Sequence, residues 1–181
     1  MSNVTYEDNV FINCPFDIEY KSLFYSIVFT IHDAGFLSRC SLEESNSGKS
    51  RFEKIKKIIS ECKYGIHDIS RTELDNNFLP RFNMPFELGV FVGAMDFGKK
   101  KDSLKSILIL DVEKYRYQKF LSDIAGRDIK GHNNSEEEVI KAVRDWLRIE
   151  SKCMERKITQ EDLFSNFIEF RDLLIAWLQE F

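Results

Sequence analysis

The fold of this chain is decided by its opening stretch, which reads Asn9-Val10-Phe11-Ile12-Asn13-Cys14-Pro15-Phe16-Asp17. The first five residues are β-rich, and Cys14-Pro15 stops the run. Apolar side chains then recur at helical spacing from residue 17 to residue 34, where Gly35 follows, and Asp17 is the expected N-cap. The stretch therefore predicts a strand, a turn and a helix in succession.

The same unit recurs along the chain. Strands are predicted at residues 9–13, 36–42, 64–70 and 106–111. Helices are predicted at residues 17–34 and 51–62, from Pro85 onward, and at 135–148 and 159–181. Strands that alternate with helices imply right-handed crossovers and a mostly parallel sheet covered on both faces. The predicted fold class is α/β, with a doubly wound sheet and C-terminal helices.

Length and composition set the expected organisation. The 181 residues, with 43% hydrophobic content, fit one compact domain at residues 1–133 with a helical extension at 134–181. The extension either packs on the core or forms an oligomer surface, so a homo-oligomer is expected. A net charge of −4 argues against duplex nucleic acid as a partner.

The same features bear on compartment and metal content. The N-terminus lacks a signal peptide and no stretch approaches the roughly 18 apolar residues of a membrane span, so a cytoplasmic protein without a membrane partner is expected. Cys14, Cys40, Cys62 and Cys153 show no metal-ligand spacing. We therefore expect reduced, buried thiols and no metal.

Polar residues gather in the loops that follow the predicted strands. In open α/β sheets the ligand crevice lies beyond the carboxyl ends of the strands, so these loops should converge. They comprise residues 13–17, 43–49 and 68–71 and the entry to the helix that holds Glu87. The sequence thus predicts one site that combines carboxylates, amides and arginines.

Glu87 is the leading candidate for catalysis. With Met84 as cap and Pro85 as the first helical residue, it falls at the third helical position, where a glutamate can accept a free backbone N–H. A carboxylate at a helix N-terminus also stays ionised, which suits a nucleophile or the stabilisation of an oxocarbenium-like transition state. Both roles can hold together.

Other candidates also have two interpretations. Asp68, at a strand end, binds a ribose hydroxyl or carries a proton, or else caps the next turn. His67 alternates to the opposite face, which predicts a hydrogen-bonded core histidine. Arg71 and Arg81 hold a phosphate or form surface ion pairs.

Three motifs carry a family resemblance, at residues 11–16, 63–70 and 86–89. Together, and in this order, they resemble the nucleoside 2-deoxyribosyltransferase-like superfamily, whose near structural relatives are the TIR-like domains of bacterial defence systems. The resemblance covers about residues 9 to 111. The whole chain also resembles a widespread bacterial group with an Asn-Cys-Pro-Phe-Asp opening.

The resemblance implies that the chain cleaves or exchanges an N-glycosidic bond, with Asp68 and Glu87 flanking a ribose. It implies no cofactor, and it places NAD, nucleosides and nucleotides among the candidate substrates and bacterial defence among the candidate roles. The loops around the two carboxylates supply the expected substrate-binding residues: Asn13, Cys14, Pro15, Phe16, Ser70, Arg71, Asn83 and Met84.

Two departures leave the substrate open. The transferases usually have a Gly-Pro turn where this chain has Cys14-Pro15, and the loop at 71–83 has an unfamiliar length. Asn13 and Phe16 bind and stack a base, or serve only the turn and the core. The alternative to an enzyme is a TIR-like sensor of a nucleotide signal, or an assembly module, without turnover.

Overall fold

The computed structural model describes residues 5–43, 48–72, 74, 81–151 and 158–179. Its centre is a five-stranded, all-parallel sheet in the order β2-β1-β3-β4-β5. The strands are β1 (Asn9–Asn13), β2 (Leu37–Cys40), β3 (Tyr64–Asp68), β4 (Ser106–Asp111) and β5 (Lys130–Gly131). The α-helices are α1 (Lys21–Asp33), α2 (Arg51–Glu61), α3 (Asn83–Phe97), α4 (Glu136–Ser151) and α5 (Gln160–Gln179). Short 3₁₀ turns are η1 (Tyr6–Asp8), η2 (Asp102–Leu104), η3 (Arg116–Lys119) and η4 (Ser122–Ile124).

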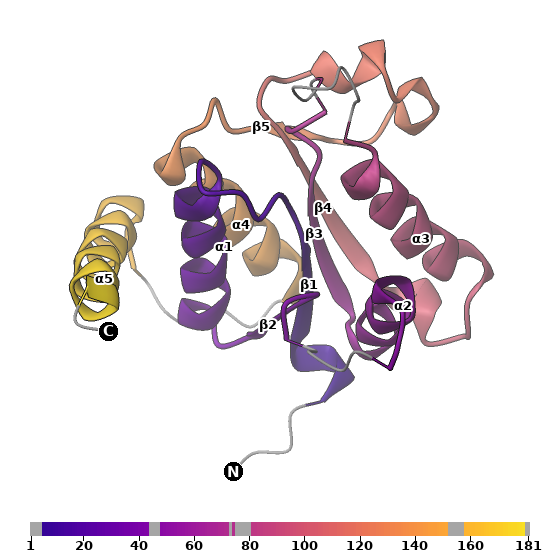
Figure 1. Cartoon of the computed structure of the whole chain (residues 1–181), viewed down its shortest axis with the longest axis horizontal. Helices are drawn as coiled ribbons and strands as arrows, with labels where there is room; N and C mark the ends of the chain where they lie inside the picture. The colour runs from indigo at the N-terminus through magenta and orange to yellow at the C-terminus, as the bar shows by residue number, and fades with distance from the viewer. Residues whose placement is uncertain (1–4, 44–47, 73, 75–80, 152–157, 180–181) are drawn as a thin grey trace.

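Helices cover both faces of the sheet, which confirms the predicted doubly wound α/β fold. Figure 1 shows α1 and α4 on one face and α2 and α3 on the other. Each face has its own apolar core, because buried strands present alternate side chains to the two layers. Ile12 and Ile66 pack with α1 and α4, whereas Phe11 packs with Ile58 of α2 and Phe91 of α3.

The C-terminal helices differ in how they attach. α4 contributes Val139 and Val143 to the same core as β1 and α1, so the sheet's covering extends past the boundary expected at residue 133. α5 lies outside α1 and α4 and is anchored by Leu163 and Phe167, which pack around Ile140. No helix in the described part of the chain is long and apolar enough to cross a membrane.

Several boundaries differ from the sequence-based expectation. α1 begins at Lys21 with Tyr20 as its N-cap, not at residue 17. Asp17 instead closes the preceding turn, where its Oδ1 accepts the Tyr20 N–H at 3.0 Å. The two-residue strand β5 was not predicted, because Lys130-Gly131 carries no apolar run of strand length.

One glycine brings α3 close to the sheet. A Cβ atom at Gly65 of β3 would lie 2.6 Å from the ring of Phe91, so no other residue fits there without movement. This close approach packs the middle of α3 against the amino half of β3, and the start of α3 is tied separately to the end of β1 by Asn13, whose side chain donates to the Met84 carbonyl. In a sheet of order 2-1-3-4-5, the carboxyl ends of β1 and β3 form the switch point at which ligands bind.

Candidate active site

Asn13, the last residue of β1, joins the three elements at the switch point. Its Nδ2 donates to the Met84 carbonyl of α3 at 2.9 Å and lies 3.0 Å from Nδ1 of His67 on β3. Because the Asn13 amide donates, Nδ1 of His67 is the acceptor and the ring proton sits on Nε2. Asn13 is therefore a buried tie between the strands, and no more than 1% of its surface is exposed.

His67 is a core histidine, as predicted. Its ring is fully buried and contacts the rings of Phe11 and Phe91 edge-on. Burial lowers the pKa of His67 to about 3, so the imidazole is neutral at pH 7. Its Nε2 atom has no hydrogen-bond partner among the described residues.

Asp68 is enclosed by donors on every side. Its Oδ1 accepts the Ser70 N–H at 2.8 Å, and its Oδ2 accepts the Tyr20 hydroxyl at 2.5 Å. The same Oδ2 lies 3.1 Å from Nε2 of His132. The bond to Ser70 confirms that Asp68 caps its turn. The carboxylate is completely buried, so in this arrangement it offers no surface to a ribose hydroxyl.

His132 has a defined tautomer. Its Nδ1 accepts the backbone N–H of Asn134 at 3.0 Å, so the ring proton belongs to Nε2, which faces Asp68. Nε2 of His132 and Oδ2 of Asp68 are within contact distance, but they do not form a regular hydrogen bond. The pair is therefore a close contact between a buried carboxylate and an imidazole N–H.

These contacts set the ionisation of the cluster. Burial alone would raise the pKa of Asp68, but His132, the Ser70 N–H and the Tyr20 hydroxyl together hold that pKa below its usual value. Burial and the adjacent carboxylate raise the pKa of Tyr20 well above its ordinary value. Asp68 is thus ionised at pH 7 and Tyr20 keeps its proton.

Glu87 occupies a different helical position from the one expected. α3 begins at Asn83 with Phe82 as its N-cap, so Glu87 is the fifth helical residue and not the third. At the fifth position a glutamate has no free backbone N–H of its own helix to accept. The predicted cap at Met84 is wrong, and helix capping does not explain this carboxylate.

Glu87 is buried yet unpaired. Only 6% of its surface is exposed, and no described residue gives it a hydrogen bond or an ion pair. Burial raises the pKa of the Glu87 carboxyl, while the charge of Arg51, at the start of α2, acts in the opposite direction. The expectation that the helix terminus keeps this group ionised is therefore corrected: the surroundings favour its protonated form relative to an exposed glutamate.

Asp68 and Glu87 do not contact each other. The helices nearest to them, α1 and α3, lie on opposite faces of the sheet. Cys14 is their common neighbour at the end of β1. Burial raises the pKa of the Cys14 thiol, and the charges of both carboxylates raise it further. Cys14 is therefore a protonated, buried thiol at pH 7, in keeping with the predicted buried cysteine.

An exposed aromatic pair joins α2 to the first turns of α3, where Phe86 directly precedes Glu87 in the chain. The rings of Phe52, in α2, and Phe86, in α3, lie 5.3 Å apart. Their exposed fractions are 38% and 57%, which is unusual for phenylalanine. The Lys56 ammonium lies 5.0 Å from the Phe52 ring. Aromatic faces and cations beside a carboxylate are groups that can stack a base and attract a phosphate.

The remaining predicted substrate-binding residues differ in how much of their surface is exposed to solvent. Pro15 and Ser70 are buried, and Phe16 packs edge-on against Phe24. Arg71 forms an ion pair with Glu19 at 3.1 Å, and Asn83 is exposed. A third buried group, Met84, contributes its carbonyl to Asn13. The structure thus brings Asn13, Cys14, Met84 and Glu87 together, and leaves Arg71 engaged elsewhere.

Sequence reasoning missed four residues here: Tyr20, Arg51, His132 and Arg116. Arg116, in η3, binds the Asp111 carboxylate at 2.6 Å and the Ser70 carbonyl at 2.7 Å, which fixes the loop after β3. Tyr20 and His132 reach Asp68 from segments far away in the sequence, and Arg116 reaches the loop after β3 from the segment after β4. Only the loop position of His132, after a polar run, could have drawn attention to it.

No described cluster of three His, Cys, Asp or Glu side chains has the geometry of a metal site. Cys14, Cys40 and Cys62 are free thiols, and Cys153 lies outside the described residues.

No family model matches the chain, and no curated protein matches its sequence.

Proposed function

We propose that this chain cleaves or transfers at the N-glycosidic bond of a nucleoside, a nucleotide or NAD, with Glu87 as the carboxylate that meets the anomeric carbon. One observation carries the proposal: Glu87 is 6% exposed and has no partner among the described residues. Burying most of a carboxyl group without a partner costs free energy, and an ionisable group whose pKa is shifted by burial is a candidate for a functional site.

The surroundings of Glu87 suit this substrate class. The exposed rings of Phe52 and Phe86 offer a stacking surface for a base, and Arg51 offers a positive charge. The site borders the switch point between β1 and β3, where ligands of such sheets bind. The family resemblance at residues 11–16, 63–70 and 86–89 points to the same chemistry.

An ionised Glu87 oxygen bonds to, or stabilises positive charge on, the anomeric carbon as the C–N bond breaks, and the base leaves with the bonding electron pair and takes up a proton from solvent. Water or a second base then attacks the same carbon, gives up a proton to solvent and frees Glu87. In this scheme the enclosed Asp68 positions the loop that begins at Ser70, because its oxygens already accept from Ser70 and Tyr20.

A second candidate is a nucleotide sensor or assembly module without turnover. It is favoured by one observation, namely that Asp68, the other expected catalytic carboxylate, is completely buried. A module of this kind would keep the stacking surface of Phe52 and Phe86 but would leave the N-glycosidic bond intact.

The two candidates are separated by incubating the purified protein with NAD, nucleoside monophosphates and deoxynucleosides. Free base is followed by chromatography, with and without a second base as acceptor. Release or exchange of base from one of these substrates supports the enzyme. Binding without release, at low and at high protein concentration, supports the sensor.

A further inference from the structure

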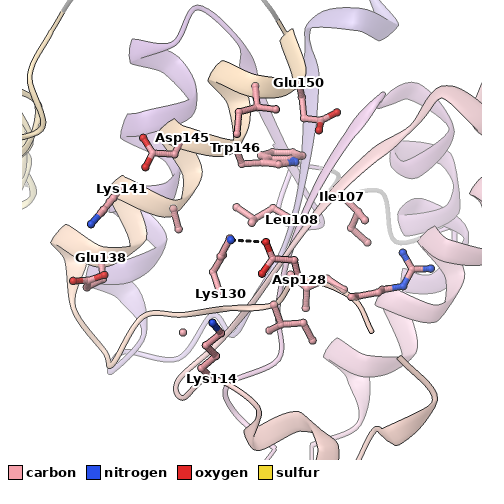
Figure 2. A pocket seen from close by; sticks show the side chains of 16 residues that line it. Ile107, Leu108, Lys114, Asp128, Lys130, Glu138, Lys141, Asp145, Trp146 and Glu150 are labelled. Carbon is pink, nitrogen blue, oxygen red and sulfur yellow. Dashed lines mark hydrogen bonds and ion pairs between the residues drawn. The ribbon is translucent and has the colours of Figure 1, made fainter. Parts of the chain in front are cut away.

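A second surface of the molecule is hollowed, away from Glu87. It is a groove of about 830 Å³ between the outer edge of β4 and α4, which we call the edge groove. Figure 2 shows the side chains of Ile107 and Trp146 lining it, with charged side chains around the rim. Ile149, in α4, also lines the groove and is 72% exposed. An apolar surface with a charged rim is typical of an interaction site.

The edge of β4 in this groove lacks a neighbouring strand. β5 pairs only with Leu110 and Asp111, so the four residues at 106–109 have no outer strand in the described structure. The Ser106 N–H points inward and donates to the Lys63 carbonyl. The Leu110 carbonyl also points inward and accepts the Ile69 N–H. Because these directions alternate along a strand, the backbone N–H and C=O of Ile107 point outward into the groove.

The two edges of the sheet are protected differently. At the opposite edge, β2 carries Arg39, whose guanidinium binds Glu43 at 2.7 Å and Glu61 at 3.2 Å. Such a charged cluster on an edge strand discourages strand addition. The open part of β4, residues 106–109, reads Ser-Ile-Leu-Ile and has no charge, proline or bulge. This edge is therefore open to pairing with another strand.

The edge groove carries charges of both signs, and Lys114 and Glu150 lie toward its two opposite ends. At the carboxyl end of β4, the backbone of Lys114 lies against Gly131, the partner of Asp111. At the amino end, Trp146 donates to Ser106 at 3.3 Å, and Glu150 follows one turn later in α4. Among described residues, neither Lys114 nor Glu150 forms an ion pair.

We propose that a second copy of this chain pairs with the outer edge of β4, antiparallel, about a two-fold axis at Ile107. A two-fold axis reverses the edge, so the Lys114 end of one copy meets the Glu150 end of the other. Lys114 of each copy then approaches Glu150 of the other, and the Ile107 N–H and C=O exchange hydrogen bonds across the axis. The positions of Lys114 and Glu150 thus favour a second copy of the chain as the partner in this groove. This proposal does not depend on the function proposed for Glu87.

Sedimentation equilibrium across a concentration series tests the pairing. The wild-type chain is expected to dimerise, and Ile149→Glu, which places a charge in the groove, is expected to weaken the dimer by about tenfold or more. Leu173→Glu is the matched control, because Leu173 is equally exposed, at 73%, but lies on α5. A wild-type monomer at every concentration, or a dimer lost in Leu173→Glu and kept in Ile149→Glu, overturns the proposal.

A charge-exchange experiment tests the two-fold arrangement. Lys114→Glu and Glu150→Lys should each weaken self-association, since both then bring like charges together. A mixture of the two variants should restore the dimer as a heterodimer, because each contact again joins opposite charges. Weakening without restoration in the mixture contradicts the antiparallel register.

Hydrogen exchange gives a readout at the backbone. The Ile107 amide should exchange more slowly in the wild-type dimer than in monomeric Ile149→Glu, while the inward Leu108 amide should change little. Equal exchange of the Ile107 amide in dimer and monomer would place the interface elsewhere.

Discussion

Nε2 of His132 lies 3.1 Å from Oδ2 of Asp68, and both side chains are completely buried. The contact joins the loop before α4 to the end of β3, across 64 residues of sequence. Tyr20, before α1, binds the same oxygen. A single carboxylate therefore ties three segments together at the carboxyl edge of the sheet.

This arrangement predicts that Asp68→Asn destabilises the fold. The amide keeps the shape of the carboxylate but turns an NH₂ group toward donors that need an acceptor, Tyr20 and His132 among them. The expected loss is about 1–3 kcal/mol in the free energy of unfolding, measured in urea. Asp123→Asn, at an exposed position, is the control and should change little. Equal stability of the two variants would contradict the role given to Asp68.

The lowered pKa of His67 predicts that the free energy of unfolding depends on pH. This pKa is about 3 in the folded chain against 6.5 for an ordinary histidine, so between these pH values the unfolded state binds a proton that the folded state does not. Stability should fall as pH decreases from 6.5 toward 3, with a contribution of up to about 1.4 kcal/mol per pH unit. His67→Asn, which removes the titration, should flatten this slope; an unchanged slope would assign it to other groups.

Glu87→Gln should stabilise the fold at pH 7. Burial raises the pKa of Glu87, so the ionised form is less stable in the folded chain than in the unfolded one, and this cost grows as pH rises through the folded pKa. Removing the charge should add about 0.5–2 kcal/mol to the free energy of unfolding, seen as a higher urea midpoint with an unchanged slope. A loss of stability instead would mean that the carboxylate has a structural partner.

Arg51→Gln should shift the titration of Glu87. The Arg51 charge lowers the pKa of Glu87, so its removal should raise that pKa. Carbon-13 NMR of the Glu87 carboxyl measures the shift directly, without reference to activity. Where base release is measurable, the acid limb of its pH profile should move to higher pH by the same amount. Lys54→Gln, in the same helix, serves as the charge-matched control.

The fold was largely predictable because each main strand carries its own signal. The apolar runs at residues 9–13, 64–68 and 106–111 have β-rich composition and strand length, so local sequence suffices. β5 has only two residues, and it is a strand by virtue of its pairing with the outer edge of β4. Pro85 favours the first helical position by its local chemistry, but α3 begins two residues earlier, at Asn83, so Pro85 is the third residue of the helix.

The site was predictable only in part. Asn13, Asp68 and Glu87 were found because strand ends and helix starts fix where residues of the adjoining loops lie. The partners of Asp68 could not be predicted from the sequence, because the approach of Tyr20 and His132 depends on how distant segments pack. The enclosure of Asp68 and the lack of a partner for Glu87 are likewise properties of packing, which no local pattern records.

The most direct test of the central claim compares base release by the wild-type chain, Glu87→Gln and Asp96→Asn on whichever substrate of the panel is cleaved. Asp96 is an exposed carboxylate on the same helix and serves as the matched control. We expect kcat/KM to fall at least about 100-fold in Glu87→Gln, with folding preserved, and to stay unchanged in Asp96→Asn. Base release by folded Glu87→Gln at the wild-type rate would contradict the proposed role of Glu87.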